Sequence, residues 1–185
     1  SEFDDVTNYV TFLHRSGVDA VIVQDLGLIS YLRKCLPNLE IHASTQLNIS
    51  NIEAVKFFSQ YCDVVVLARE LGLDEIAKIK KETNAELEVF VHGALCVSES
   101  GLCLFSSFLG GKSANRGMCA QACRRFYTAE VPGGIDQGYY FSPCDFQSLY
   151  LSISSLDGLV ILQFASLVFF IMASLISLIV IFFHL

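Results

Sequence analysis

Short apolar runs and amphipathic stretches alternate along the first 96 residues of the chain. The apolar runs are rich in β-branched residues, which is typical of buried strands, and they predict strands over 19–25, 39–45, 63–68 and 86–91. The stretches before and between them carry apolar residues three or four positions apart and predict helices over 6–14, 28–35, 52–61 and 74–82. Because each pair of parallel strands needs a crossover helix, this alternation indicates a parallel sheet covered by helices.

Four such units fit either an open doubly wound sheet or part of a (β/α)8 barrel. No Gly-x-Gly-x-x-Gly motif follows the first strand, which argues against a dinucleotide site. We therefore predict an α/β fold that forms part of a TIM-type barrel. A complete barrel needs about 250 residues, so residues 1–95 are predicted to form four βα units of an incomplete barrel. The chain begins with Ser1 rather than Met, and we expect it to be a piece of a larger protein.

Hydrogen-bonding residues stand at the ends of all four predicted strands, beginning with Gln24 and Asp25 at the first. Both candidate folds bind ligands at the carboxyl ends of their strands, and such residues either cap the next helix or line a polar pocket there. We predict a pocket, in which an arginine could hold a carboxylate or phosphate and a histidine could transfer protons. The candidate catalytic residues are Gln46, Arg69, Glu70 and His92.

The end of the chain differs from the rest. Residues 158–184 contain no Asp, Glu, Lys or Arg and exceed the roughly 20 apolar residues that cross a bilayer, so they predict an apolar C-terminal helix, connected by residues 128–157. Because flanking Lys, Arg and Trp anchors are missing, this tail is either a membrane anchor or foreign to the globular part. No secretory signal is visible; we expect a cytoplasmic protein, membrane-associated only if the tail is native.

The composition, 53% hydrophobic with a net charge of -7, excludes a disordered chain, a collagen and a strongly basic nucleic-acid wrapper. Residues 91–127 nevertheless hold four bases and one acid, and a local positive potential attracts anions whatever the net charge. These bases either offset the charge of nearby thiolates or bind a phosphate or carboxylate of the substrate. They are the candidate substrate-binding residues, namely Lys112, Arg116, Arg124 and Arg125.

Four of the seven cysteines lie in segment 96–127, at Cys96, Cys103, Cys119 and Cys123. Without a secretory signal, disulfides are the least expected use of these thiols. The spacing Cys119-x3-Cys123 suits zinc, whereas the wider Cys96-x6-Cys103 spacing in a glycine-containing loop suits an iron–sulfur cluster. Spacing favours the cluster, with zinc as the alternative. Of the other three cysteines, Cys35 and Cys62 are predicted to be packing residues.

Several motifs resemble the signature of the peptidase U32 family, the collagenase-like proteases. The motifs are HASTQ at 42–46, EVFVHGALC at 88–96, SGLCLFS at 100–106 and NRGMCAQACRR at 115–125. The resemblance implies an incomplete barrel-type domain and a 4Fe-4S cluster with Cys96, Cys103 and Cys119 as ligands. Many relatives place a further cysteine beyond a Ser-Pro-basic-Asp segment, where this chain has SPCDFQ at 142–147. The fourth ligand is then Cys123 or Cys144.

The resemblance implies two different activities. Family members are named as proteases, and several are iron–sulfur proteins that support hydroxylation of tRNA, ribosomal RNA or the ubiquinone ring. No zinc-protease helix, serine elbow or local cysteine-protease motif is present in the sequence. The thiols, bases and polar strand ends together favour iron–sulfur-dependent RNA or cofactor modification. The alternatives are a collagenase-like peptidase and a non-catalytic iron–sulfur partner protein. For the favoured function, the expected substrate is RNA or a small molecule. A protein partner could complete the assembly.

Overall fold

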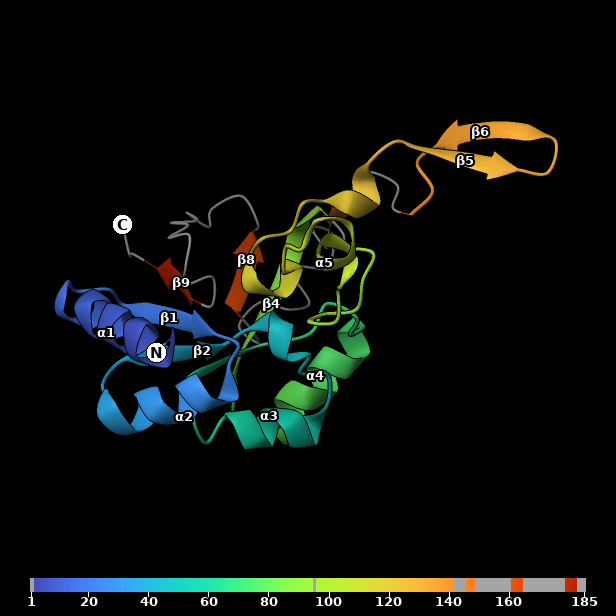
Figure 1. Cartoon of the computed structure of the whole chain (residues 1–185). Coiled ribbons are helices and arrows are strands. Elements are labelled where there is room, and N and C mark those ends of the chain that lie inside the picture. Colours follow the sequence, from blue (N-terminus) through green and yellow to red (C-terminus); the bar gives the residue numbers. More distant parts are fainter. Residues whose placement is uncertain (1, 95, 142–145, 149–160, 165–178, 183–185) are drawn as a thin grey trace.

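The computed structural model of the chain describes residues 2–94, 96–141, 146–148, 161–164 and 179–182 (Figure 1). Its α-helices are α1 (Glu2–Arg15), α2 (Leu26–Cys35), α3 (Ile52–Phe58), α4 (Leu73–Glu82) and α5 (Phe105–Gly110). Short 3-10 helices follow at η1 (Thr45–Leu47), η2 (Ala114–Arg116) and η3 (Ala122–Arg124). The strands are β1 (Ala20–Val23), β2 (Glu40–Ala43), β3 (Val64–Val66), β4 (Glu86–Ala94), β5 (Tyr127–Val131), β6 (Gly134–Gly138), β7 (Phe146–Ser148), β8 (Ile161–Phe164) and β9 (Ile179–Phe182).

The centre of the fold is a parallel sheet in the order β4-β3-β2-β1. Alternate residues of these strands join apolar residues of α1 to α4 in one buried core, with helices on one side of the sheet (Figure 1). The core holds fully buried side chains such as Val10, Leu32, Ile41 and Leu87. The alternation predicted from the sequence is confirmed, and the structure is a mixed α/β fold consistent with a partial β/α architecture.

The crossover helices begin where the sequence supplies acceptors for their first free N–H groups. The side chain of Asp25 accepts a hydrogen bond from the Leu28 N–H at 2.7 Å, and that of Asn51 accepts one from the Ala54 N–H at 2.9 Å. These caps hold each helix immediately after a strand or its following turn. The carboxyl ends of β2, β3 and β4 are therefore left at one edge of the sheet, followed by loops that carry the predicted site.

The predicted apolar helix over 158–184 is wrong for the residues of that range that the structure describes. Strand β8 pairs parallel with β4, and β9 pairs antiparallel with β1. All residues of β9 are β-branched or aromatic, and β8 begins with Ile161 and ends with Phe164. The outer strands of the four-stranded sheet have unpaired N–H and C=O groups that such segments can satisfy. The rest of 158–184 lies outside the described residues. No helix in the described parts of the chain is long and apolar enough for a membrane span.

Within the predicted connecting segment 128–157, the structure has a β-hairpin. Strands β5 and β6 pair antiparallel with Val131 opposite Gly134, so Pro132 and Gly133 form the connecting loop. Gly133 has a φ of +107°, which favours glycine at this position. The hairpin projects from the body of the molecule, beyond α5 and the carboxyl end of β4 (Figure 1).

Candidate functional site

The cysteine segment begins where β4 ends, so the strand delivers Cys96 to the edge of the sheet where β2 and β3 also end. Residues 96–104 cross this edge and meet the loops that follow β2 and β3. The contacts that hold them come from three of the predicted strand-end residues and from Asn48. The structure therefore places the predicted polar residues and the predicted thiol segment together.

The side chain of Ser100 is the centre of the first contact. Ser100 is completely buried, and its N–H and hydroxyl both donate to Oε1 of Glu70, at 2.8 and 3.2 Å. Its Oγ in turn accepts hydrogen bonds from Nε and the backbone N–H of Arg69, at 3.2 and 3.4 Å. Arg69 and Glu70 thus hold the thiol segment in place, which is a positioning role that the sequence did not suggest.

A second contact joins the same segment to the loop after β2. The Asn48 amide donates to a carboxylate oxygen of Glu99 at 2.9 Å. Gly101 has a φ of +78°, and a Cβ at this position would lie 2.1 Å from the carbonyl oxygen of Gln46. A side chain larger than hydrogen cannot fit there without moving one of the two backbones. Gln46 therefore meets the cysteine segment through its main chain.

The Cys123 thiol lies in the field of two other predicted ligand thiols. Burial raises the pKa of Cys123, and the charges of Cys96 and Cys119 raise it further. Cys103 is half-buried on the same segment. In the described parts of the chain, no three His, Cys, Asp or Glu side chains are arranged to hold a metal ion as they stand. Cys144 lies outside the described residues.

The donor set nevertheless fits a thiolate-ligated centre in its chemistry. Thiolates are the ligands of iron–sulfur clusters and of many zinc sites, and the segment carries Cys96, Cys103, Cys119 and Cys123. The hydroxyl of Ser106, which is buried in α5, accepts a hydrogen bond from the Ala120 N–H at 3.0 Å. This bond ties the stretch that carries Cys119 to α5.

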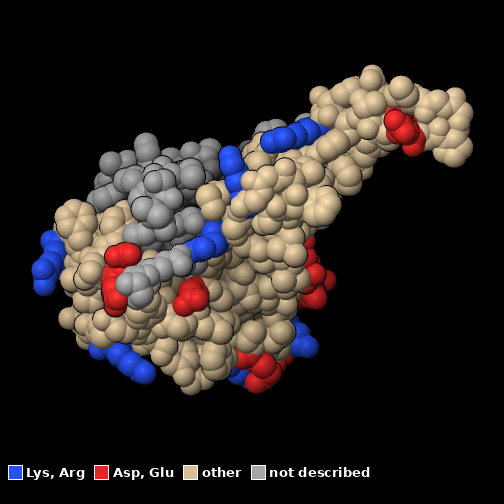
Figure 2. All heavy atoms as spheres, in the orientation of Figure 1, with Lys and Arg blue, Asp and Glu red and all other residues tan. Residues whose placement is uncertain are grey.

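The four predicted substrate-binding bases lie around the same segment. Lys112 follows α5, Arg116 ends η2, and Arg124 and Arg125 lie at η3, just before β5. The guanidinium of Arg125 donates to the Ala120 carbonyl at 3.4 Å, next to Cys119. Figure 2 shows basic side chains at the base of the projecting hairpin and along the adjoining surface. This surface can attract an anion as well as offset thiolate charge.

His92 lies within β4, four residues before Cys96, and its backbone pairs with Ser148 of β7. A second histidine, in the HASTQ motif, is buried in the sheet. His42 of β2 is 7% exposed, with Nδ1 3.2 Å from Glu88 and Nε2 2.8 Å from Glu40. Glu88, on β4, is 2% exposed. In the sequence, His42 and Glu88 are each a polar residue between two apolar neighbours.

The His42 contacts predict a pH dependence of stability. Burial alone would lower the pKa of His42, but hydrogen bonds and charge from Glu88 and Glu40 outweigh it, so the pKa is raised above 6.5. A raised folded-state pKa stabilises the protein fully below the unfolded-state value, and this stabilisation is lost as the pH rises through the folded-state value. We expect the free energy of unfolding, measured in urea, to fall above about pH 6.5.

His42→Gln should remove this fall, because glutamine does not titrate. The matched control is His14→Gln, which removes a histidine of α1 instead. Equal pH slopes in wild type and His42→Gln would contradict the assignment.

The two remaining cysteines lie apart from the candidate site. Cys62 is buried, as predicted for a packing residue, and burial raises its pKa to about 12. Cys35 is exposed at the end of α2, so the prediction that it packs in the core is wrong. Helix α2 ends there, and its last two residues, Lys34 and Cys35, are exposed.

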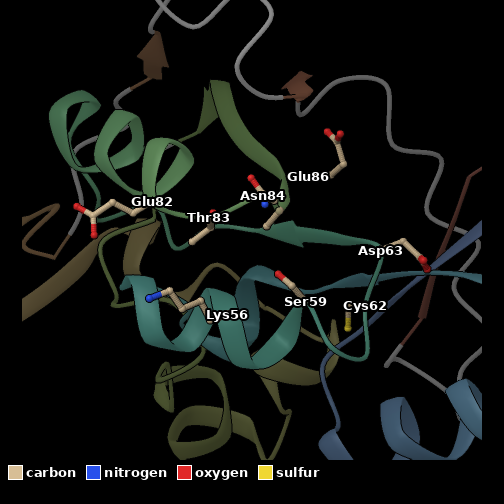
Figure 3. A pocket seen from close by; sticks show the side chains of 9 residues that line it. Lys56, Ser59, Cys62, Asp63, Glu82, Thr83, Asn84 and Glu86 are labelled. Atoms are coloured by element: carbon tan, nitrogen blue, oxygen red, sulfur yellow. The ribbon is translucent and has the colours of Figure 1, made fainter.

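A cavity of about 520 Å³ lies beside Cys62, between the end of α3 and the chain that enters β4 (Figure 3). Its lining includes Lys56, Asp63 and Glu86, and none of the predicted site residues. It opens at the amino ends of β3 and β4, whereas ligands of parallel α/β folds bind at the carboxyl ends. We therefore place the candidate site at the cysteine segment.

Fold and site together define an α/β protein with a thiol-bearing segment held at the carboxyl edge of a parallel sheet. Comparison with known families matches peptidase family U32 over residues 1–166, and the chain belongs to this family. The predicted resemblance is confirmed.

Named relatives fall into two groups. The chain is similar to the 23S rRNA 5-hydroxycytidine synthase of Escherichia coli, with 48% identity over 134 residues, which are 72% of this chain and 20% of that protein. It is 46% identical to tRNA hydroxylation protein P of Haemophilus influenzae over 122 residues, 65% of this chain and 26% of the relative. It is 38% identical to a collagenase of Porphyromonas gingivalis over 160 residues, 78% of this chain and 38% of the relative. The chain spans only about a fifth to two fifths of these relatives.

Proposed function

We propose that the chain is part of an iron–sulfur-dependent protein that supports hydroxylation of RNA. The observation that supports this proposal is a segment with four cysteines and four bases that Arg69 and Glu70 anchor, through Ser100, at the carboxyl edge of the sheet. The identities of 46–48% to proteins named for rRNA and tRNA hydroxylation support it. In the whole protein, further strands would complete a TIM-type barrel, and this edge of the sheet would be its catalytic mouth.

In this proposal each group has a distinct task. Cys96, Cys103 and Cys119 hold the 4Fe-4S cluster, with Cys123 as the fourth ligand and Cys144 as the alternative. When bound, the cluster supplies electron transfer. Arg69 and Glu70 fix the ligand loop through Ser100. Lys112, Arg116, Arg124 and Arg125 attract the RNA phosphates, and His92 is the candidate for proton transfer.

The alternative supported by a specific observation is a peptidase, because the similarity to the named collagenase covers 78% of the chain. A peptidase would need a free nucleophile or a zinc-bound water. Cys96 is the cysteine nearest to His92 in sequence, at the end of the same strand. The same thiol cannot act as a free nucleophile while it is a ligand, so the metal content separates the two functions. Zinc in place of the cluster, together with cleavage of gelatin, would favour the peptidase.

Anaerobic purification with iron, sulfide and zinc analysis tests the proposal. We expect a broad absorption band near roughly 400 nm and its loss, together with most of the iron, in Cys96→Ser and Cys119→Ser. Cys35→Ser is the matched control, since Cys35 is exposed on α2, away from the segment. Comparison of Cys123→Ser with Cys144→Ser identifies the fourth ligand, because only the true ligand should be needed for full iron content.

The activity itself is tested in a bacterial strain that lacks its own RNA hydroxylation proteins. Expression of the protein should restore a hydroxylated nucleoside, detected by mass spectrometry of digested rRNA and tRNA, and Cys96→Ala should not. Restoration by Cys96→Ala would exclude a role for the thiol in the reaction. A wild-type protein that binds the cluster but restores no nucleoside would favour the non-catalytic partner protein.

A further inference from the structure

The outer face of the β5–β6 hairpin presents two aromatic rings to solvent near its base. Phe126 is 57% exposed and Tyr139 is 61% exposed, and their ring centroids lie 5.4 Å apart in an edge-to-face arrangement. Two large rings that pack on each other and still remain exposed indicate a surface that another molecule covers.

The hairpin holds these rings outward because Tyr127, on its other face, packs at its base against Phe105 of α5. The rings of Phe105, Tyr127 and Phe141 form a cluster with centroid separations of 5.0 to 6.5 Å. The Tyr127 hydroxyl also donates to the Ala122 carbonyl at 2.8 Å. Since successive residues of a strand point to opposite faces, the inward position of Tyr127 turns Phe126 outward. The ring pair is therefore supported rather than free to collapse onto the body of the protein.

Polar groups that can form hydrogen bonds lie next along the same face. Thr128 pairs with Gln137 in the hairpin register, and the Gln137 amide donates to the Thr128 hydroxyl at 3.2 Å. Both side chains are exposed and keep further donors and acceptors for a ligand. Aromatic rings with an adjacent amide and hydroxyl are the groups that stack on unpaired bases and bond to their edges.

The charged residues around the base of the hairpin indicate which kind of molecule binds this face. Residues 100–129 contain four bases and no acid, and the exposed Arg125 directly precedes Phe126. Figure 2 shows basic side chains at the base of the hairpin. The hairpin also holds two acids: Glu130 lies nearer the turn, and the Asp136 carboxylate accepts a hydrogen bond from the Gln137 N–H at 2.9 Å. A positive surface beside stacking rings is typical of sites for single-stranded nucleic acid.

We propose that Phe126 and Tyr139 form a stacking platform for unpaired nucleotides of RNA, with Gln137 and Thr128 bonding to base edges and Arg125 to phosphate. This inference rests on the proposed RNA function and adds to it the site where the substrate is held. Arg125 also contacts Ala120, next to the predicted ligand Cys119. RNA held on the platform would thus pass close to the cysteine segment.

Fluorescence anisotropy of the complete chain with a labelled, unstructured oligoadenylate of about 12 nucleotides tests the platform. The test variant is Phe126→Leu with Tyr139→Leu, which keeps apolar side chains and removes both rings. We expect RNA binding to weaken by roughly 5- to 150-fold, the range for the loss of one stacked base. Phe126→Trp should bind at least as tightly as the wild type.

Two controls separate stacking from a general loss of structure. Ile135→Ala changes an exposed apolar residue of the same hairpin near the turn, and Phe12→Ala removes an exposed ring from α1. Both should leave the RNA affinity unchanged. Equal affinity of the double leucine variant and the wild type would overturn the proposal, as would absence of binding by the wild type.

If the leucine substitutions abolish self-association of the chain in sedimentation and leave RNA affinity unchanged, the face is a protein contact and the proposal is overturned. None of these outcomes decides the proposed function, which the nucleoside assay with Cys96→Ala tests without the hairpin. Loss of RNA affinity with retained iron content would place the defect at the platform rather than at the cluster.

Discussion

Gly101→Ala is expected to release residues 96–104 from the edge of the sheet and to lower the free energy of unfolding by about 3 kcal/mol or more. Two costs combine in this variant. A residue with a side chain at a φ of +78° costs about 1–3 kcal/mol, and the new Cβ would lie 2.1 Å from the Gln46 carbonyl oxygen. Urea unfolding and amide hydrogen exchange of the segment are the measurements.

Two other glycines of the chain separate these costs. Gly111 also has a positive φ, +65°, but nothing lies within 4 Å of a Cβ there, so Gly111→Ala measures the backbone cost alone. Gly110 has open space and no positive φ, and Gly110→Ala should not destabilise the protein. If Gly101→Ala and Gly111→Ala lose the same stability, the close approach to Gln46 does not contribute.

Glu70→Ala is expected to have the second largest effect. It leaves the N–H and hydroxyl of the fully buried Ser100 without their acceptor, and each unsatisfied buried donor costs about 1–3 kcal/mol. Glu70→Gln keeps an acceptor oxygen and should retain most of the stability. We expect urea unfolding to show a loss of about 2–4 kcal/mol for alanine and a much smaller loss for glutamine.

The same pair of variants distinguishes positioning from acid–base catalysis. A positioning residue tolerates glutamine in the nucleoside assay, whereas a catalytic carboxylate loses activity with glutamine while stability is retained. Glu53→Ala is the control, because the Glu53 carboxylate is exposed and its ion pair is with the exposed Lys56. Equal stability of Glu70→Ala and Glu53→Ala would contradict the anchoring role of Glu70.

Local pattern was sufficient to predict the central sheet and its helices. Strands such as Val64–Val66 are continuous apolar runs, and caps such as Asp25 mark helix starts in the sequence itself. The placement of the cysteine segment beside the strand ends could also be predicted, because β4 leads directly into Cys96. Both features depend on neighbours in the sequence and on a general rule of parallel α/β folds.

Contacts between distant residues were not predictable in the same way. Nothing near Ser100 in the sequence indicates that its partners are Arg69 and Glu70. The hairpin could have been predicted from the turn residues Pro132-Gly133-Gly134, which lie between two short runs that contain β-forming residues. The acidic residues of this stretch drew attention away from that pattern. The strands β8 and β9 were mistaken for helix because hydropathy alone does not distinguish a buried strand from a buried helix.

The anchoring of the cysteine segment has a consequence for the order of assembly. Its contacts join residues far apart in the chain, 30 positions between Glu70 and Ser100 and 51 between Asn48 and Glu99. Such long closures form late, after the strands that carry the partners have come together. The cysteine segment is thus anchored only in a nearly finished protein, and the proposed cluster would be inserted as one of the last events of its maturation.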